Sequence, residues 1–360
     1  MKMKKLSKNF TSKLITYAMV IVAYIVMASL LNAGALTRSI KGQLVPICVY
    51  IVMAVSLNLT VGISGELSLG HAGFMSVGAF VGAVAASMMA GITSPTLKLI
   101  LAMLIGGIAA SIAGVIIGVP VLRLRGDYLA IVTLAFGEII RNVLNCLYVA
   151  QDGGHLVMAF NNPVVQDAEH AAQGMPFKML INGPQGAAIS EKLATFGMGF
   201  VLILFSLLVV LNLIDSRSGR AIMAIRDNRI AAESVGISAT RYKMMAFVIS
   251  ASLAGMAGAL YALNYSTVTA SKFKFDTSIL VLVFVVLGGI GNIRGSIIAA
   301  TLLTVLPELL RAFNDYRMLV YAIVLILVML ATNNERFKQW RGVLAEKLKK
   351  NKANAGEGGV

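Results

Sequence analysis

Charged residues are scarce in this chain. Only 13% of its 360 residues are Asp, Glu, Lys or Arg, whereas 58% are hydrophobic. Soluble domains carry about 25% charged residues, and apolar runs of about 20 residues are typical of transmembrane helices. The composition therefore excludes an ordinary soluble domain and predicts an all-α integral membrane protein whose core lies largely within the bilayer.

Cysteines and catalytic motifs are also few. Cys48 and Cys146 both fall in apolar runs, so neither a structural disulfide nor a metal site is expected. The chain lacks the phosphate-binding motif G-x-x-x-x-G-K-[ST], and it lacks H-E-x-x-H and G-x-S-x-G. We therefore expect no cofactor, and no ATP hydrolysis by a phosphate-binding loop in this chain.

A net charge of +15 could suggest nucleic acid as a partner. The basic residues instead gather at the ends of apolar runs and in the two tails, as membrane topology requires. The pattern predicts contact with membrane lipid and no nucleic-acid binding.

Ten apolar runs are candidate membrane spans. They lie at 14–33, 43–61, 71–91, 97–119, 128–148, 196–214, 244–263, 277–290, 295–313 and 317–332. The first run could pass for a signal peptide, but it exceeds the roughly 7–15 residues of a signal h-region, so an uncleaved span is predicted. Ten crossings put both basic termini on one side, the cytoplasm by the positive-inside rule. A re-entrant Gly-rich segment would change the count by one or two.

The expected organisation has three parts: a basic cytoplasmic N-terminus (1–13), a transmembrane domain (14–332) and a basic cytoplasmic tail (333–360). Residues 149–195 form the one long extracytoplasmic loop, either a docking surface or a solvated lid. Residues 215–243 form a cytoplasmic loop.

This second loop carries a strong charge bias. Residues 216–244, called here the basic loop, hold six Lys or Arg against Asp227 and Glu233. Asn228 can cap a short helix from 229 to 235, and Gly236 can end it in a left-handed conformation. A capped helix on a cytoplasmic loop is suited to contact a partner, or alternatively to lie on the inner leaflet.

Two Gly-rich stretches interrupt the apolar pattern, at residues 62–73 (the first break) and 288–295 (the second break). Unwound backbone at membrane depth is tolerated only where protein or a water-filled cavity satisfies it. Both breaks therefore suggest a polar pathway, with Ser64, Ser68 and His71 as candidate lining residues. Tight loops and a structural His71 are the alternatives.

Small residues recur at four-residue spacing in several spans, for example Gly78 with Gly82 and Gly114 with Gly118. Such spacing lets helix backbones approach closely, so we interpret it as helix packing.

Three polar residues, Glu138, Arg141 and Asn142, lie within the fifth run. Glu138 and Arg141 are three residues apart and can pair on one helix face. Ionisable groups within spans usually face a cavity or one another, so this group is either part of a solute pathway or an ion pair that steadies the bundle.

Four stretches, in this order, resemble the permease subunits of bacterial branched-chain amino acid ABC importers of the LivM-like type. They are LNLTVGISGELSLGHAGFMSVGAF (57–80), GDYLAIVTLAFGEIIRNVL (126–144), RDNRIAAESVGISATRYKMMAFVISASLAGMAGALYA (226–262) and VVLGGIGNIRGSIIAA (285–300). The resemblance covers most of the chain.

The resemblance implies a subunit that carries leucine, isoleucine or valine across the bacterial inner membrane; related permeases carry urea, amides or nucleosides. It implies a second, LivH-like permease, two ATP-binding subunits and an extracytoplasmic solute-binding protein as partners. The ATPase-coupling positions would be Ala231, Ala232, Glu233 and Gly236, where this chain has Ala-Ala-Glu in place of the family's Glu-Ala-Ala. The alternative from another class is a membrane enzyme that uses Glu138, Arg141 and His71.

Overall fold

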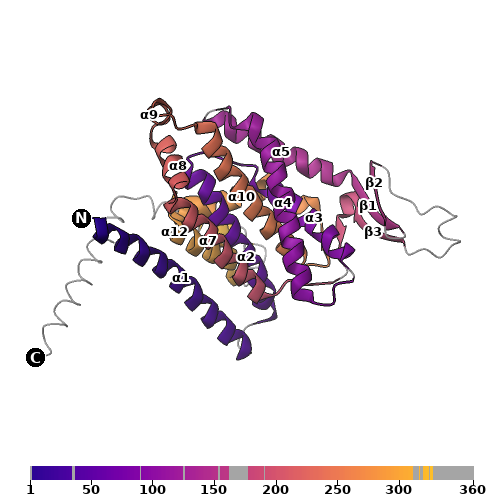
Figure 1. Cartoon of the computed structure of the whole chain (residues 1–360). Helices are drawn as coiled ribbons and strands as arrows, with labels where there is room; N and C mark the ends of the chain where they lie inside the picture. The colour runs from indigo at the N-terminus through magenta and orange to yellow at the C-terminus, as the bar shows by residue number, and fades with distance from the viewer. Residues whose placement is uncertain are drawn as a thin grey trace, which may run out of the picture. The chain divides into compact units, whose positions relative to one another are not determined.

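Among the residues that the structure describes, seven helices are long and apolar enough to cross a membrane (Figure 1). They belong to α1 (Lys2–Asn32), α2 (Arg38–Asn58) with the π-helical turn Leu59–Ile63, α3 (His71–Met88), α4 (Pro95–Val121), α5 (Asp127–Asn145), α7 (Phe196–Asp215) and α10 (Ala239–Ala262). The computed structural model describes residues 2–34, 37–89, 91–124, 126–152, 155–161, 177–189, 191–310, 316, 319–323 and 325–326. These helices confirm the predicted polytopic helical fold.

The last three predicted spans are not among these seven helices. The runs at 277–290 and 295–313 overlap α11 (Phe275–Gly288) and α12 (Ile293–Leu309). Most of 317–332, and all of the tail 333–360, lie outside the described residues. Helix α11 has 14 residues, or about 21 Å, which is shorter than a bilayer core of about 30 Å. The number of crossings therefore stays a prediction. The chain divides into two compact units, Met1–Thr304 and Val305–Val360, and all features below belong to the first.

Helices α3, α4 and α10 pack closely through their small residues. Gly78 of α3 lies against the backbone of Gly255 in α10, and Gly258 lies against the carbonyl of Met75. A Cβ atom at either glycine would overlap main-chain atoms. Gly82 and Gly114 likewise face Ala259 and Ala251. The four-residue spacing therefore serves helix packing, as expected.

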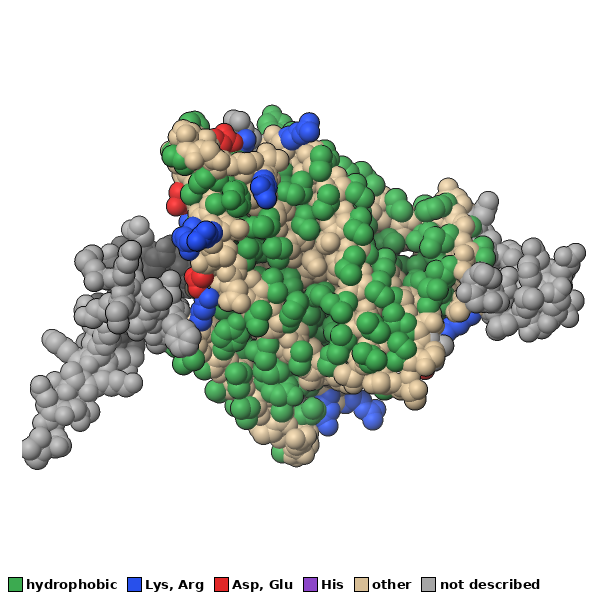
Figure 2. All heavy atoms as spheres, viewed as in Figure 1, with side chains coloured by type: hydrophobic (Ala, Val, Ile, Leu, Met, Phe, Trp, Pro, Cys, Tyr) green, Lys and Arg blue, Asp and Glu red, His purple; other side chains and the backbone are tan. Residues whose placement is uncertain are grey.

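Helices α1 and α2 differ sharply in burial. The span of α2 is 94% buried inside the protein, whereas that of α1 is 11% buried. Figure 2 shows hydrophobic side chains over the middle of the visible face and Lys and Arg side chains toward its ends. Such a surface suits a lipid environment, with the charged groups at the interfaces.

The basic loop forms two helices, α8 (Arg217–Asp227) and α9 (Arg229–Ser234). An antiparallel sheet, absent from the prediction, lies at the end of the bundle away from them (Figure 1). Its strands are β1 (Leu147–Asp152), β2 (His155–Phe160), β3 (Phe177–Asn182), β4 (Ala187–Ala188) and β5 (Thr267–Val268), in the order β2-β1-β3-β4-β5. Strand β1 starts inside the predicted fifth span, which ends at Asn145 instead of 148. Pairing of Ala187 with Val268 joins the predicted outer loop to the turn after α10.

Candidate functional site

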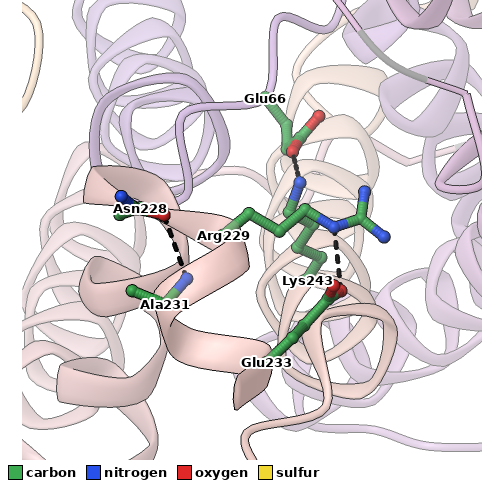
Figure 3. Close-up of polar contacts among 6 residues, drawn as sticks. All are labelled: Glu66, Asn228, Arg229, Ala231, Glu233 and Lys243. Atoms are coloured by element: carbon green, nitrogen blue, oxygen red, sulfur yellow. Dashed lines mark hydrogen bonds and ion pairs between the residues drawn. The ribbon is translucent and has the colours of Figure 1, made fainter. Parts of the chain in front are cut away.

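The basic loop folds into two capped helices, α8 (Arg217–Asp227) and α9 (Arg229–Ser234). The Asn228 side chain accepts a hydrogen bond from the Ala231 amide at 3.0 Å, as Figure 3 shows. Gly236, with φ of +83°, ends the helix in the left-handed region, where residues with a Cβ are strained. The cap predicted at Asn228 and the left-handed Gly236 are both confirmed.

Helix α9 is anchored on one side and exposed on the other. Ala232 is buried in a small cluster with Ile225 and Ala239. Ile230 and Val235 are 82% and 74% exposed. The Arg229 guanidinium pairs with Glu233 at 2.9 Å (Figure 3). A short rigid helix that presents two aliphatic side chains to solvent is suited to enter a cleft of another protein.

Helix α8 contacts the first break directly. Arg226 Nη1 donates to the carbonyl oxygen of Gly62 at 2.9 Å, and Arg226 Nη2 pairs with Asp227 at 3.0 Å. Gly65 has φ of +74°, and a Cβ there would lie 2.6 Å from Cγ of Arg226. The glycine therefore leaves the space in which the arginine side chain lies.

A second connection joins the first break to the start of α10. Lys243 pairs with Glu66 (Figure 3), and their side chains are only 13% and 11% exposed. These two residues, with Ser64, Arg226 and Arg229, help to line a polar cavity of about 350 Å³. The first break is thus held by α8 at Arg226 and by the start of α10 at Lys243.

The two breaks lie against each other at Gly62 and Gly291, and Asn58 of α2 bonds to the second break beside this contact. Its Oδ1 accepts from the Gly291 amide at 2.9 Å, and its Nδ2 donates to Ser296 Oγ at 2.9 Å. A Cβ on Gly62 would overlap both Asn58 and the Gly291 amide. Sequence reasoning missed Asn58, although an Asn in an apolar run four residues before a glycine break is an available signal.

The remaining candidates on the first break are buried. His71 begins α3, and its Nε2 lies 2.8 Å from Ser56 Oγ. The hydroxyls of Ser64 and Ser68 are buried without a hydrogen-bond partner among the described residues. Burial of an unsatisfied hydroxyl is costly, so these two groups are the first to consider for contact with a solute or water.

The polar group of α5 is connected elsewhere. Arg141 Nε donates to Glu138 Oε2 at 2.7 Å, so the expected ion pair is present. Glu138 Oε1 accepts from the Phe275 amide at 3.2 Å and so caps the first turn of α11. Asn142 is exposed. The first break instead contacts α5 at Thr133, whose hydroxyl accepts from the Leu69 amide.

Among the described residues there is no group of three His, Cys, Asp or Glu side chains that could hold a metal ion. The basic loop and the two glycine breaks form one junction, held by hydrogen bonds and ion pairs.

Comparison with known proteins gives a consistent result. Residues 39–329 match the family model described as the branched-chain amino acid transport system permease component. The chain is 37% and 36% identical, each over 286 residues, to the high-affinity branched-chain amino acid transport system permease protein LivM of Escherichia coli and of Salmonella typhimurium. Both matches cover 78% of this chain and 66% of the relative, just under two thirds of the length.

A more distant relative is the permease protein BraD of Pseudomonas aeruginosa, named for the same transport system. It is 26% identical over 297 residues, which cover 78% of this chain and 89% of BraD. No solved structure matches the chain.

Proposed function

The chain belongs to the family of branched-chain amino acid transport system permease components, and on that premise we propose that it is a permease subunit of an ATP-driven importer for leucine, isoleucine and valine. It is a multi-pass membrane protein of that family. The names of LivM and BraD support the substrate class. ATP hydrolysis is assigned to two separate ATP-binding subunits, because this chain has no phosphate-binding loop.

The observation that carries this proposal is the connection between an exposed capped helix and the glycine breaks. Helix α9 would dock in a cleft of the ATP-binding subunit through Ile230 and Val235, with Ala231, Ala232, Glu233 and Gly236 as the coupling positions. Movement of α9 would be passed to α8, because their short connection at Asn228 is a cap of both helices. Arg226 would then move the first break at Gly62.

This assignment sets the orientation. The basic loop and both termini would face the cytoplasm, and the sheet would face the outside, where a solute-binding protein docks. A second, related permease would complete the pathway. Ser64, Ser68 and His71, with Glu138, Arg141 and Asn142, are the proposed pathway residues of this subunit.

The docking of α9 can be tested with Ile230→Asp, which places a carboxylate on the contact surface. ATP-driven uptake of labelled leucine by proteoliposomes that hold the complete importer should fall about tenfold or more, because burial of an unpaired carboxylate in an apolar contact is costly. Thr240→Asp adds the same charge at the exposed start of α10 and should leave uptake unchanged. Equal uptake by the two variants would contradict the docking assignment.

Gly236→Trp tests the end of the helix. The space beside Gly236 is open, so the chain should still insert in the membrane, but a Trp disfavours the left-handed turn and would obstruct the docking surface. Uptake should be lost while capture of leucine by the binding protein persists. Gly236→Asn, which tolerates this conformation, should retain uptake.

The partners can be identified by purifying the tagged chain from its native membrane in mild detergent. Mass spectrometry should find an ATPase with a phosphate-binding loop and a second, similar permease. A chain that is stably folded and comes out alone would contradict the importer assignment.

A further inference from the structure

Among the described side chains, helix α1 makes polar contacts with the bundle at one place and aromatic contacts at another. Near its N-terminal end Lys13 Nζ pairs with Asp215 of α7 at 2.5 Å, and Thr16 Oγ1 accepts from Arg294 Nε of α12 at 2.7 Å. Two turns further on, the Tyr24 ring stacks on Phe200 with centroids 4.0 Å apart. Only 11% of the apolar span of α1 is buried, and a gap remains between these contacts.

The gap is an apolar cavity of about 260 Å³. Met19 and Ala23 of α1, Ile51 of α2, Ile203 of α7 and Ile298 of α12 are among its lining residues. The Thr301 hydroxyl in this lining already donates to the Ile297 carbonyl at 2.8 Å. Apolar cavities of this kind do not hold water but accept apolar molecules. At membrane depth the available apolar molecule is a lipid acyl chain.

A second cavity, of about 530 Å³, lies one turn toward the N-terminal end of α1. Its ionisable lining groups are Lys13, Arg226, Arg294 and Asp215, three cations against one carboxylate. Lys13 pairs with Asp215 and Arg226 with Asp227, so the cavity offers a phosphate group the N–H donors of clustered basic side chains. Lys13 is also the first residue of the apolar span, which places the cavity at a membrane interface.

The two cavities follow the same helices. On α1 the lining passes from Lys13 and Thr16 to Met19, and on α12 from Arg294 to Ile298. The apolar part extends along α1 from Met19 to Met27, about 12 Å, which fits within the roughly 15 Å of one leaflet. A basic end continued by an apolar channel matches a molecule with an anionic head and an apolar tail.

We propose that the seam between α1, α7 and α12 binds one anionic glycerophospholipid, with its phosphate at Lys13 and Arg294 and one acyl chain along Met19, Ala23 and Ile298. The lipid would fill the gap beside α1 and hold this weakly packed helix on the bundle. The proposal requires only that the chain lies in a membrane, so it does not depend on which solute is transported.

The test uses the purified full-length chain, stripped of lipid in detergent, with phosphatidylglycerol or phosphatidylcholine added back and bound lipid counted by native mass spectrometry. One phosphatidylglycerol should be retained in preference to phosphatidylcholine. Lys13→Gln should weaken this binding about fivefold, as expected for one basic group near an anionic lipid. Arg38→Gln removes an exposed charge from the start of α2 and should change nothing.

The acyl-chain site has its own matched pair of variants. Ala23→Trp fills the apolar cavity and should abolish lipid retention, whereas Ala18→Trp, on an exposed part of α1 outside the cavity lining, should not. Phosphatidylglycerol should raise the melting temperature of the unmodified chain and of Ala18→Trp, but not that of Ala23→Trp. The comparison of melting temperatures between Ala18→Trp and Ala23→Trp tests the lipid site even if Lys13→Gln disturbs folding.

Three results would overturn the proposal. Equal retention of phosphatidylglycerol and phosphatidylcholine would contradict a site that selects an anionic head group. Full retention by Ala23→Trp, or displacement of the lipid by inorganic phosphate alone, would indicate an anion site without an acyl chain. Loss of the site when a second permease subunit is bound would assign the seam to a protein contact.

Discussion

The guanidinium of Arg226 donates a hydrogen bond to the carbonyl of Gly62, a residue 164 positions earlier in the chain. This contact joins the basic loop to the point where α2 unwinds. Gly65, one turn further on, has no side chain to displace the arginine. Under the proposed coupling, a movement of α8 would act on the first break through this short, charge-assisted contact.

Arg226→Ala should reduce ATP-driven uptake of leucine by the reconstituted importer about tenfold or more, since a hydrogen bond to a charged group contributes about 1.5–3 kcal/mol. ATP hydrolysis should persist, because α9 is unchanged. Arg220→Ala is the matched control: among the described residues Arg220 donates only to the Asp215 carbonyl, at 2.9 Å, at the end of the preceding helix α7. Equal uptake by the two variants would exclude Arg226 from coupling.

Glu66 and Lys243 should behave as a coupled pair. Glu66→Gln or Lys243→Met leaves a poorly exposed charge without its partner and should cost at least about 1–3 kcal/mol. The double variant should lose less than the sum of the two, as measured by thermal unfolding in detergent. Glu233→Gln breaks the more exposed pair with Arg229 and should change stability by about 1 kcal/mol or less. Strict additivity at Glu66 and Lys243 would argue against the pair.

Glu138→Gln should lower uptake, because the neutral amide leaves the Arg141 cation unpaired within a span. The double variant Glu138→Gln with Arg141→Gln removes both charges. Recovery of uptake by the double variant would assign the pair to bundle packing, whereas continued loss would support a role in the pathway. If Glu138→Gln leaves the rate of uptake and the affinity for the solute unchanged, Glu138 and Arg141 have a packing role only.

Acid should weaken one contact near the sheet. Lys98 Nζ lies 2.8 Å from Glu191 Oε2, and this hydrogen bond lowers the pKa of Glu191 below its usual value of 4.5. The Glu191 carboxyl therefore binds a proton less readily in the folded protein than in the unfolded chain. The contact with Lys98 stabilises the fold at pH values above the pKa that Glu191 has in the unfolded chain. This stabilisation is lost as the pH falls through the lower pKa that Glu191 has in the folded protein. The melting temperature of Glu191→Gln should be below that of the unmodified chain at pH 7, with the difference narrowing below about pH 4.5. Lys192→Gln should show no such pH-dependent difference.

Local signals in the sequence predicted the parts of the site that local chemistry controls. The Asn228 cap, the left-handed Gly236 and the ion pair of Glu138 with Arg141 each depend on residues a few positions apart. The contacts of Arg226 with Gly62 and of Asn58 with Gly291 join segments 164 and 233 residues apart. No periodicity encodes such distances, so the junction of the loop with both breaks became evident only from the fold.

The helical bundle was predictable because apolar length dominates the pattern of a membrane span. The sheet was not predictable, because some of its strands are too short, and too far apart in the chain, to leave a pattern in the sequence. Strands β4 and β5 have two residues each, too few to show an alternation, and β5 comes from a turn nearly 80 residues further along the chain.

The loose attachment of α1 has a consequence for the order of assembly. Helix α1 precedes α7 in the chain, yet its Tyr24 packs on Phe196 and Phe200 of α7, and its Lys13 pairs with Asp215, all of which are synthesised much later. It must therefore wait in lipid as a lone span and join the bundle only after α7 has inserted. A substitution such as Tyr24→Ala would then show itself as slow maturation and early proteolysis of newly made chains, even where the finished transporter works normally.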